Sequence, residues 1–335
     1  MLRRRSFPPP PTGAVARLAG SALRLAQTVA ASRWVRWGFV AVAVLAGAGA
    51  LAPHRHAIAE SVRQIGAGAV LASSAAAVAG LAATLQAWRA TLAGLGSDLP
   101  TAKAAKVFFV GQLGKYIPGS VWPIVAQAEL ARAYAIPRHR SSTAALLTML
   151  LSLAAGLLTA ATTVPVALAG QDVRYWWLLA AVPVIAAALH PRLVNAALAA
   201  TLRIIRRPPL ARPFPARAVL TAIGWSVGSW LLFGIHIWLL LAPLADDPGK
   251  ALTVSVGGFA LAWCAGFLLV IAPAGVGARD VVLIALLTTQ AGSAEATAVA
   301  LLSRAVMTAA DLLLAGAVAL PARRAQPSPN RDAAI

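Results

Sequence analysis

Five charged residues stand in or beside long apolar stretches of this chain, where ionisable side chains are rare. They are Lys115, Arg279, Asp280, Arg304 and Asp311. An ionisable group inside a membrane-crossing segment is costly unless it faces a partner or water. Cations and carboxylates brought together in such a place can bind an anion, for example a phosphate, and hold one another through ion pairs. We find no nucleophile–base pair, Walker loop or metal-ligand spacing, and therefore expect neither an enzyme nor a bound metal or cofactor.

The first of these residues stands at a break in an apolar stretch, which reads Gly111-Gln-Leu-Gly-Lys115-Tyr-Ile-Pro118-Gly-Ser-Val-Trp122. Pro118 cannot continue a helical hydrogen-bond ladder, Gly119 permits an irregular turn, and Ser120 can cap the helix that restarts. The new helix would direct free N–H groups and its positive dipole end into the protein, beside Lys115, which favours an anion. The alternative is an ordinary interfacial loop with a tryptophan anchor. The candidate binding residues here are Lys115, Tyr116, Pro118, Gly119, Ser120 and Trp122.

A second break of the same design reads Ile271-Ala-Pro273-Ala-Gly-Val-Gly277-Ala-Arg279-Asp280. Asp280 in the first turn of the next helix would complement its dipole. Arg279 could pair with Asp280 or reach a phosphate through two hydrogen bonds. The alternative is a structural turn with a surface salt bridge. The candidate binding residues of this break are Pro273, Gly275, Gly277 and Arg279.

Two ionisable residues of the last apolar stretch lie seven positions apart. That spacing puts Arg304 and Asp311 on one helix face, which we expect to be turned inward. The predicted partners are Asp280 for Arg304, and either Lys115 or Arg279 for Asp311. The alternative for Arg304 is that its side chain reaches the nearer membrane interface.

The composition identifies the elements that must position these residues. The chain has 335 residues, of which 59% are hydrophobic and 12% charged, and its mean hydropathy is +0.76. A soluble domain carries about 25% charged residues. The net charge of +19 comes largely from arginine clusters outside the apolar segments, as in cytoplasmic loops of membrane proteins, so we do not expect nucleic-acid binding. The single cysteine, Cys264, excludes an intrachain disulfide.

The apolar segments predict an all-α polytopic membrane protein. We expect about eight spanning helices plus one re-entrant helical hairpin, with the two broken-helix motifs facing each other. The predicted spans are 37–52, 65–88, 142–168, 175–190, 218–241, 252–271, 278–291 and 297–320, and the hairpin covers 107–136. The domain boundaries are 1–34 for a basic N-terminal tail with either an interfacial amphipathic helix or frayed chain, 35–320 for the transmembrane domain, and 321–335 for a disordered cytoplasmic tail.

The arginine clusters orient these spans with both termini in the cytoplasm. The turn at 246–249 and the turn after the short helix 278–291 then lie outside, whereas the loops at 89–106 and 132–140 lie inside. In this topology both breaks open toward the cytoplasm and meet in one inward-facing pocket.

Three weaker patterns predict packing rather than a site. His236 is expected to be a hydrogen-bonded core residue. Glu129 and Arg132 are expected to pair with each other on the returning helix of the hairpin. Small residues at Gly66, Gly68, Gly224 and Gly228 suit close helix packing.

The two breaks also resemble the motifs of a known family. The segment at 115–122 resembles its "KY-x-PG-x-x-W" signature, that at 273–280 resembles "P-x-G-x-G-x-R-E", and Leu302-Ser-Arg304 resembles the arginine near the start of its final span. The family is the transmembrane, flippase-like region of lysylphosphatidylglycerol synthases and related stand-alone membrane proteins, and the resemblance covers roughly 35–320. It implies a helical bundle with re-entrant helices that moves aminoacylated phosphatidylglycerol or other lipids between leaflets.

The chain departs from the family pattern at two places. The acidic residue that ends the second motif is Asp280 instead of the usual Glu. Span 142–168 has Leu147, Thr148 and Met149 where many relatives carry an intramembrane Glu. Since the sequence ends at Ile335, we expect a stand-alone member that lacks the soluble aminoacyltransferase domain, which makes the lipid, and is therefore not a complete synthase. We expect it in a bacterial plasma membrane.

The leading hypothesis is a flippase-like transporter for an anionic or aminoacylated phospholipid or a lipid-linked precursor. The ten residues of the two breaks would receive the headgroup, and Asp280, Arg304 and Asp311 would form an internal ion-pair network. The alternative is a non-transporting membrane partner that recruits or stabilises a glycosyltransferase or a lipid-modifying enzyme. In both cases the expected partners are membrane phospholipids, anionic ones above all.

Overall fold

The structure is a computed structural model that describes residues 55–117, 121–168, 173–204, 213–268 and 277–320. The chain divides into two units, Met1–Pro53 and His54–Ile335, and all described residues belong to the second. The predicted span 37–52 and both tails lie outside the described residues. So do five candidate site residues, which are Pro118, Gly119, Ser120, Pro273 and Gly275.

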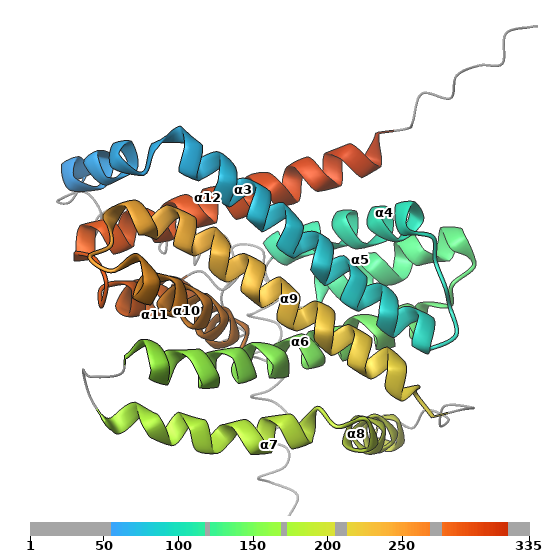
Figure 1. Cartoon of the computed structure of the whole chain (residues 1–335). Helices are drawn as coiled ribbons and strands as arrows, with labels where there is room; N and C mark the ends of the chain where they lie inside the picture. Colours follow the sequence, from blue (N-terminus) through green and yellow to red (C-terminus); the bar gives the residue numbers. More distant parts are fainter. Residues whose placement is uncertain (1–54, 118–120, 169–172, 205–212, 269–276, 321–335) are drawn as a thin grey trace, which may run out of the picture. The chain divides into compact units, whose positions relative to one another are not determined.

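Every element of the described part is a helix (Figure 1). The longer helices are α3 (Arg55–Gly94), α6 (Arg138–Ala167), α9 (Ala216–Leu241), α10 (Pro248–Leu268) and α12 (Ser293–Ala319). The shorter α-helices are α4 (Thr101–Gln112), α5 (Trp122–Ala131), α7 (Ala181–Ala188), α8 (Pro191–Ile204) and α11 (Ala278–Leu287). Short 3₁₀ helices are η2 (Leu113–Tyr116), η3 (Arg132–Tyr134), η4 (Val173–Ala180) and η5 (Ala242–Leu244).

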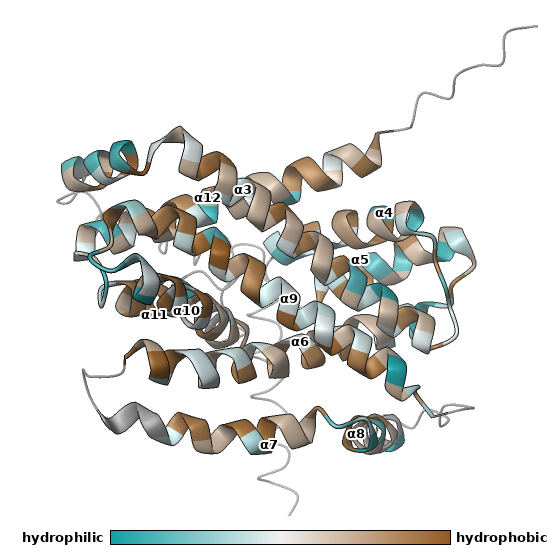
Figure 2. Cartoon of the chain, in the orientation of Figure 1, coloured by the Kyte–Doolittle hydropathy of each residue, from teal (hydrophilic) through white to brown (hydrophobic). Residues whose placement is uncertain are grey.

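Five of these helices are long and apolar enough to cross a membrane, as the hydrophobic colouring of Figure 2 illustrates. They are His56–Gly94, Arg138–Ala167, Ala216–Leu244, Pro248–Leu268 and Ser293–Ala319. A sixth span arises if the pair Trp177–Ala188 and Pro191–Ala200, bent by 72°, is counted as one. The protein is therefore a multi-pass membrane protein, all-helical in the part that the structure describes. Helix α11 has 10 residues, about 15 Å, which is half the hydrocarbon thickness, so it cannot cross alone as the predicted span 278–291 would.

Hydrogen bonds show which turns share an end of the bundle. Arg140 Nη1 donates to the Gly96 carbonyl oxygen at 3.0 Å, so the turn after α3 lies beside the start of α6. Elsewhere, the Asp246 N–H donates to the Gln290 carbonyl oxygen at 3.3 Å, so the turn before α10 lies beside the turn after α11. The predicted topology pairs the same turns, the first two inside and the last two outside.

The long helices pack around a buried hydrogen-bonded histidine. Helix α3 packs along α9, α10 packs against α6 and α9, and α12 packs against α3. His236 of α9 is fully buried. Its Nδ1 lies 2.6 Å from Ser73 Oγ on α3, and its Nε2 lies 2.9 Å from Ser303 Oγ on α12. His236 is therefore a hydrogen-bonded core residue, as the sequence predicted, and its hydrogen bonds join α9 to α3 and α12.

Close helix packing occurs at other glycines than those the sequence suggested. A Cβ on Gly66, Gly68, Gly224 or Gly228 would meet no described atom within 4 Å. Gly66 instead bends α3, with φ 72°, a value that glycine adopts without strain. Tight approaches lie at Gly80, Gly94, Gly111, Gly114, Gly156, Gly234 and Gly257.

The predicted pair of Glu129 and Arg132 is present and has a third member. Glu129 accepts hydrogen bonds from Arg132, at 2.7 Å, and from Arg138, at 2.6 Å. The hydrogen bonds from Arg138 and then from Arg132 lower the pKa of the Glu129 carboxyl. This exposed carboxylate links the end of α5 to the start of α6.

Candidate functional site

The first break turns the chain back on itself as a helical hairpin. Helices α4 and α5 pack against each other, with η2 between them. A Cβ on Gly114 would lie 2.8 Å from both the Trp122 carbonyl carbon and the Pro123 nitrogen, and a Cβ on Gly111 would lie 3.1 Å from the Gln127 nitrogen. Only a residue without a side chain permits such contact between backbones. The hairpin therefore brings Lys115 and Tyr116 to a fixed place at its turn.

The second break ends at a glycine in a conformation that other residues avoid. Gly277 has φ 95°, and α11 begins directly after it. The Asp280 carboxylate accepts a hydrogen bond from the Gly277 N–H at 3.2 Å. Because a carboxylate already serves this helix N-terminus, the chain's own Asp280 occupies the position that an anion would take.

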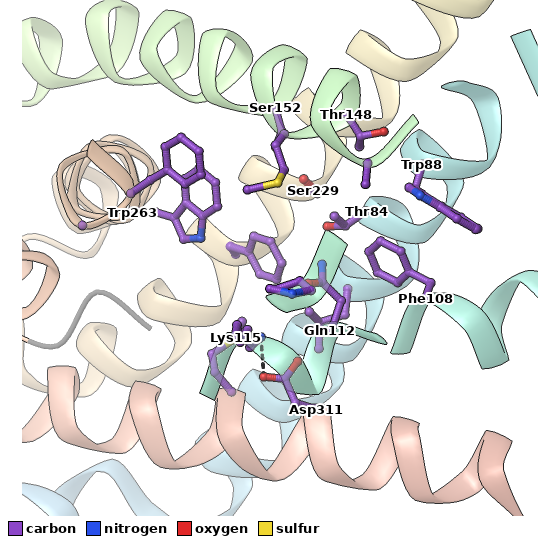
Figure 3. A pocket seen from close by; sticks show the side chains of 18 of the residues that line it. Thr84, Trp88, Phe108, Gln112, Lys115, Thr148, Ser152, Ser229, Trp263 and Asp311 are labelled. Atoms are coloured by element: carbon purple, nitrogen blue, oxygen red, sulfur yellow. Dashed lines mark ion pairs between the residues drawn. The ribbon is translucent and has the colours of Figure 1, made fainter. Parts of the chain in front are cut away.

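Two ion pairs join the breaks to the last helix. Lys115 Nζ lies 2.6 Å from Asp311 Oδ2, as the dashed line in Figure 3 shows. Arg304 Nη2 lies 3.2 Å from Asp280 Oδ2. The Tyr116 hydroxyl also donates to Asp311 Oδ2, at 2.7 Å. The sequence named Asp280 as the partner of Arg304 and left two partners open for Asp311, and the fold selects Lys115.

This selection leaves Arg279 without a carboxylate partner among the described residues. Its guanidinium instead lies over the Phe259 ring, 4.7 Å from the ring centroid, which is a cation–π contact. With Lys115 paired to Asp311 and Arg304 paired to Asp280, the five charges of the site sum to +1. The uncompensated positive charge sits at Arg279.

These groups line one cavity of about 360 Å³. Both breaks contribute to its wall, as the sequence predicted when it placed them in a single pocket. The predicted residues in the wall are Lys115, Tyr116, Arg279, Arg304 and Asp311. Asp280 stands behind Arg304, whereas Trp122 and Gly277 are exposed and lie outside the wall.

The sequence did not identify the neutral part of this wall. Its aromatic residues are Trp88, Phe108, Trp230, Phe233, Phe259, Trp263 and Phe267. Its uncharged polar residues are Thr84, Gln112, Gln127, Thr148, Ser152, Ser229 and Thr308. A usable signal was the recurrence of amides near the first break, at Gln112 and Gln127, because an amide inside apolar sequence needs a hydrogen-bonding partner.

The Arg304–Asp280 ion pair is expected to make a modest contribution to the free energy of unfolding, and its two members are expected to contribute together. Both side chains are about 30% exposed (31% and 30%), so solvent screens the pair. Arg304→Met and Asp280→Asn should each lower the free energy of unfolding by about 1 kcal/mol, and the asparagine keeps an acceptor for the Gly277 N–H. The double variant should lose less stability than the sum of the losses of the two single variants. Thermal unfolding in detergent measures these losses. Strictly additive losses would count against the pair.

Fold and cavity together define the class: a multi-pass helical membrane protein with a charged, partly aromatic cavity between broken helices. A search of curated proteins gave no match. A family model does match, over residues 21–315, and it describes the lysylphosphatidylglycerol synthase TM region. The chain belongs to this family. The match includes both breaks and all the charged residues of the cavity.

Proposed function

We propose that this protein binds the phosphate of an anionic lipid headgroup in the cavity and moves that headgroup between the leaflets of the membrane. The observation that carries the proposal is the Arg279 guanidinium in the cavity wall, which has no carboxylate within ion-pair distance among the described residues. A phosphodiester carries one negative charge, and the site has a net charge of +1. Binding would neutralise the site, and Coulomb attraction favours this charge balance.

The surface beside the cavity supports a lipid rather than a fully water-soluble ligand. Ile117 belongs to the cavity wall and is 47% exposed. Val121 and Val125, on the outer side of the same hairpin, are 57% and 52% exposed. Exposed apolar side chains that lie together in this way are typical of a surface that contacts a membrane or a partner. A headgroup could therefore enter beside the hairpin while its acyl chains stay in the lipid.

Membership of the family also supports a lipid as the ligand, since the family description concerns the membrane region of a lipid-modifying protein. Our proposal extends to a plasma-membrane location with both termini in the cytoplasm, so that the cavity opens inward. The alternative role, a membrane partner that binds lipid or recruits an enzyme without transport, shares the cavity but not the movement between leaflets.

Proteoliposomes with a fluorescent acyl-labelled phosphatidylglycerol test the proposal. Dithionite bleaches only the outer leaflet of sealed vesicles, so transport appears as loss of the protected fluorescence. We expect transport above protein-free vesicles, and Arg279→Ala should slow it at least about ten-fold, because a charge-assisted contact to the phosphate is lost.

The matched control is Lys250→Ala, which removes a cation that is 65% exposed and pairs with Asp247, away from the cavity wall. This variant should transport like the parent protein. Transport equal to that of protein-free vesicles would refute the transport proposal. If lipid binding nevertheless depended on Arg279, the non-transporting role would be favoured.

A further inference from the structure

The cavity has a charged side and a neutral side. Figure 3 shows Lys115 and Asp311 on one side and Thr148 and Ser152 of α6 across from them. Among the described residues that line the cavity, every charged one comes from η2, α11 or α12. A headgroup whose phosphate lies at Arg279 would extend the rest of its atoms toward uncharged polar and aromatic side chains.

One hydrogen-bond donor and one acceptor among the wall residues are buried without a partner. The Trp88 side chain is 1% exposed and its Nε1 has no hydrogen-bond partner in the described structure. Gln127 is 3% exposed and its Oε1 is likewise unpartnered there. Buried polar groups of proteins are nearly always paired, so two exceptions in one cavity wall point to groups that a ligand supplies.

The chemistry of these two atoms restricts that ligand. An indole N–H can only donate, and the amide oxygen can only accept. A hydroxyl group can both accept and donate, so a headgroup with hydroxyls could satisfy both Trp88 and Gln127. An ammonium has donors only and would leave the Trp88 N–H unpaired.

The charges of the cavity also disfavour an ammonium. Asp311 is occupied by Lys115 and the Tyr116 hydroxyl, and Asp280 is occupied by Arg304 and the Gly277 N–H. Of the aromatic rings in the wall, that of Phe259 already contacts Arg279. The other rings could stack on an ammonium, but they carry no net charge that would neutralise it. A headgroup that carries an ammonium would thus add a positive charge to a site that is already positive, and both carboxylates described at this site are already paired.

We infer that the cavity selects a phosphodiester lipid whose headgroup ends in hydroxyl groups, such as a polyol or a sugar, over lipids whose headgroup carries an ammonium, aminoacylated ones included. The inference rests on the proposed function, because it places the phosphate at Arg279. It narrows the substrate from anionic or aminoacylated lipids to hydroxyl-bearing anionic lipids.

Native mass spectrometry of the purified protein tests this selection. The protein is equilibrated in mixed micelles with equal amounts of phosphatidylglycerol, lysyl-phosphatidylglycerol, phosphatidylethanolamine and phosphatidic acid, the last of which has the phosphate but no alcohol hydroxyls. We expect phosphatidylglycerol to be retained at least about ten-fold over lysyl-phosphatidylglycerol and phosphatidylethanolamine, because each of these adds a positive charge to a site that is already positive.

Two wall variants separate the hydroxyl contacts from the phosphate contact. Trp88→Phe removes the N–H and keeps an aromatic ring, and Gln127→Leu removes the acceptor. Each should reduce the preference for phosphatidylglycerol over phosphatidic acid by about five- to ten-fold, as expected for one buried hydrogen bond, whereas Arg279→Ala should weaken both lipids together. The matched control is Trp238→Phe, because Trp238 Nε1 bonds to the Pro248 carbonyl oxygen outside the cavity. This control should not change the ratio.

A soluble competitor distinguishes a lipid site from a site for free phosphate compounds. Glycerol 3-phosphate at millimolar concentration should not displace phosphatidylglycerol, and displacement would overturn the assignment to a lipid. Retention of lysyl-phosphatidylglycerol equal to or above that of phosphatidylglycerol, with binding still dependent on Arg279, would overturn the selection and leave the proposed function standing. Equal retention of all lipids, unaffected by Arg279→Ala, would overturn both.

Discussion

Lys115→Met is expected to lower the free energy of unfolding by about 3 kcal/mol. The Asp311 side chain is only 4% exposed, and without Lys115 its charge would keep the Tyr116 hydroxyl as its one described partner. Breaking a buried pair by removing one partner costs about 3–5 kcal/mol because the remaining charge is left uncompensated. We expect the lower end, since the Lys115 side chain is 30% exposed. Thermal unfolding in detergent measures the loss.

The two halves of this pair are not equivalent, and this provides the control. Asp311→Asn should cost less than Lys115→Met, because the lysine can extend its ammonium toward water and the buried carboxylate cannot. The double variant Lys115→Met/Asp311→Asn should recover most of the stability, with the amide oxygen accepting from Tyr116. A double variant as unstable as Lys115→Met alone would contradict the ion pair as the source of the loss.

Gly114→Ala is expected to destabilise the helical hairpin by about 3 kcal/mol, the upper part of the range for overpacking. The added Cβ would lie 2.8 Å from the Trp122 carbonyl carbon and the Pro123 nitrogen. These are backbone atoms at the start of α5, so they cannot move aside as the end of a flexible side chain could. Separation of α4 from α5 would also displace Lys115, which is the next residue. The expected result is a lower unfolding temperature and loss of lipid binding together.

Gly316→Ala is the matched control for this variant. A Cβ there meets no described atom within 4 Å, and Gly316 lies in α12 without a positive φ. Alanine is favoured over glycine in a helix by about 1 kcal/mol, so this variant should be neutral or slightly more stable. If Gly114→Ala and Gly316→Ala behaved alike, the close backbone contact in the hairpin would not be important for stability.

The membrane class and the breaks were predictable because they depend on local sequence. Hydropathy summed over about 20 residues decides whether a helix can lie in lipid, and the helices at 138–167 and 293–319 match the predicted spans 142–168 and 297–320 within a few residues. The predicted span 175–190 has a different outcome, since the structure adds α8 (Pro191–Ile204) after a sharp bend. Proline can enter at the first turn of a helix, so Pro191 gave no clear sign of whether the helix ended or restarted.

For each charged residue in a span, the sequence predicted one or two candidate partners. An ionisable group in a span is costly unless it faces a partner or water, and the apolar part of the chain offers few opposite charges. Arg304 had one suggested partner, Asp280, and the pair is present. Asp311 had two, and sequence spacing could not choose between them, because almost 200 residues separate Tyr116 from Asp311 and their approach depends on how the helices pack.

What the sequence determined by itself is a helical membrane protein with two interrupted segments that carry charge, since composition, proline and glycine act locally. What only the tertiary structure decided is the pairing of Lys115 with Asp311, which leaves Arg279 without an ion-pair partner among the residues that the structure describes. It also decided that Trp88 and Gln127 lie in the same cavity wall. A threonine, an amide or a tryptophan in a spanning helix has the same local pattern whether it faces a neighbouring helix or a cavity. The packing of α3, α5 and α6 around η2, which carries Lys115, decides which of these side chains face the cavity.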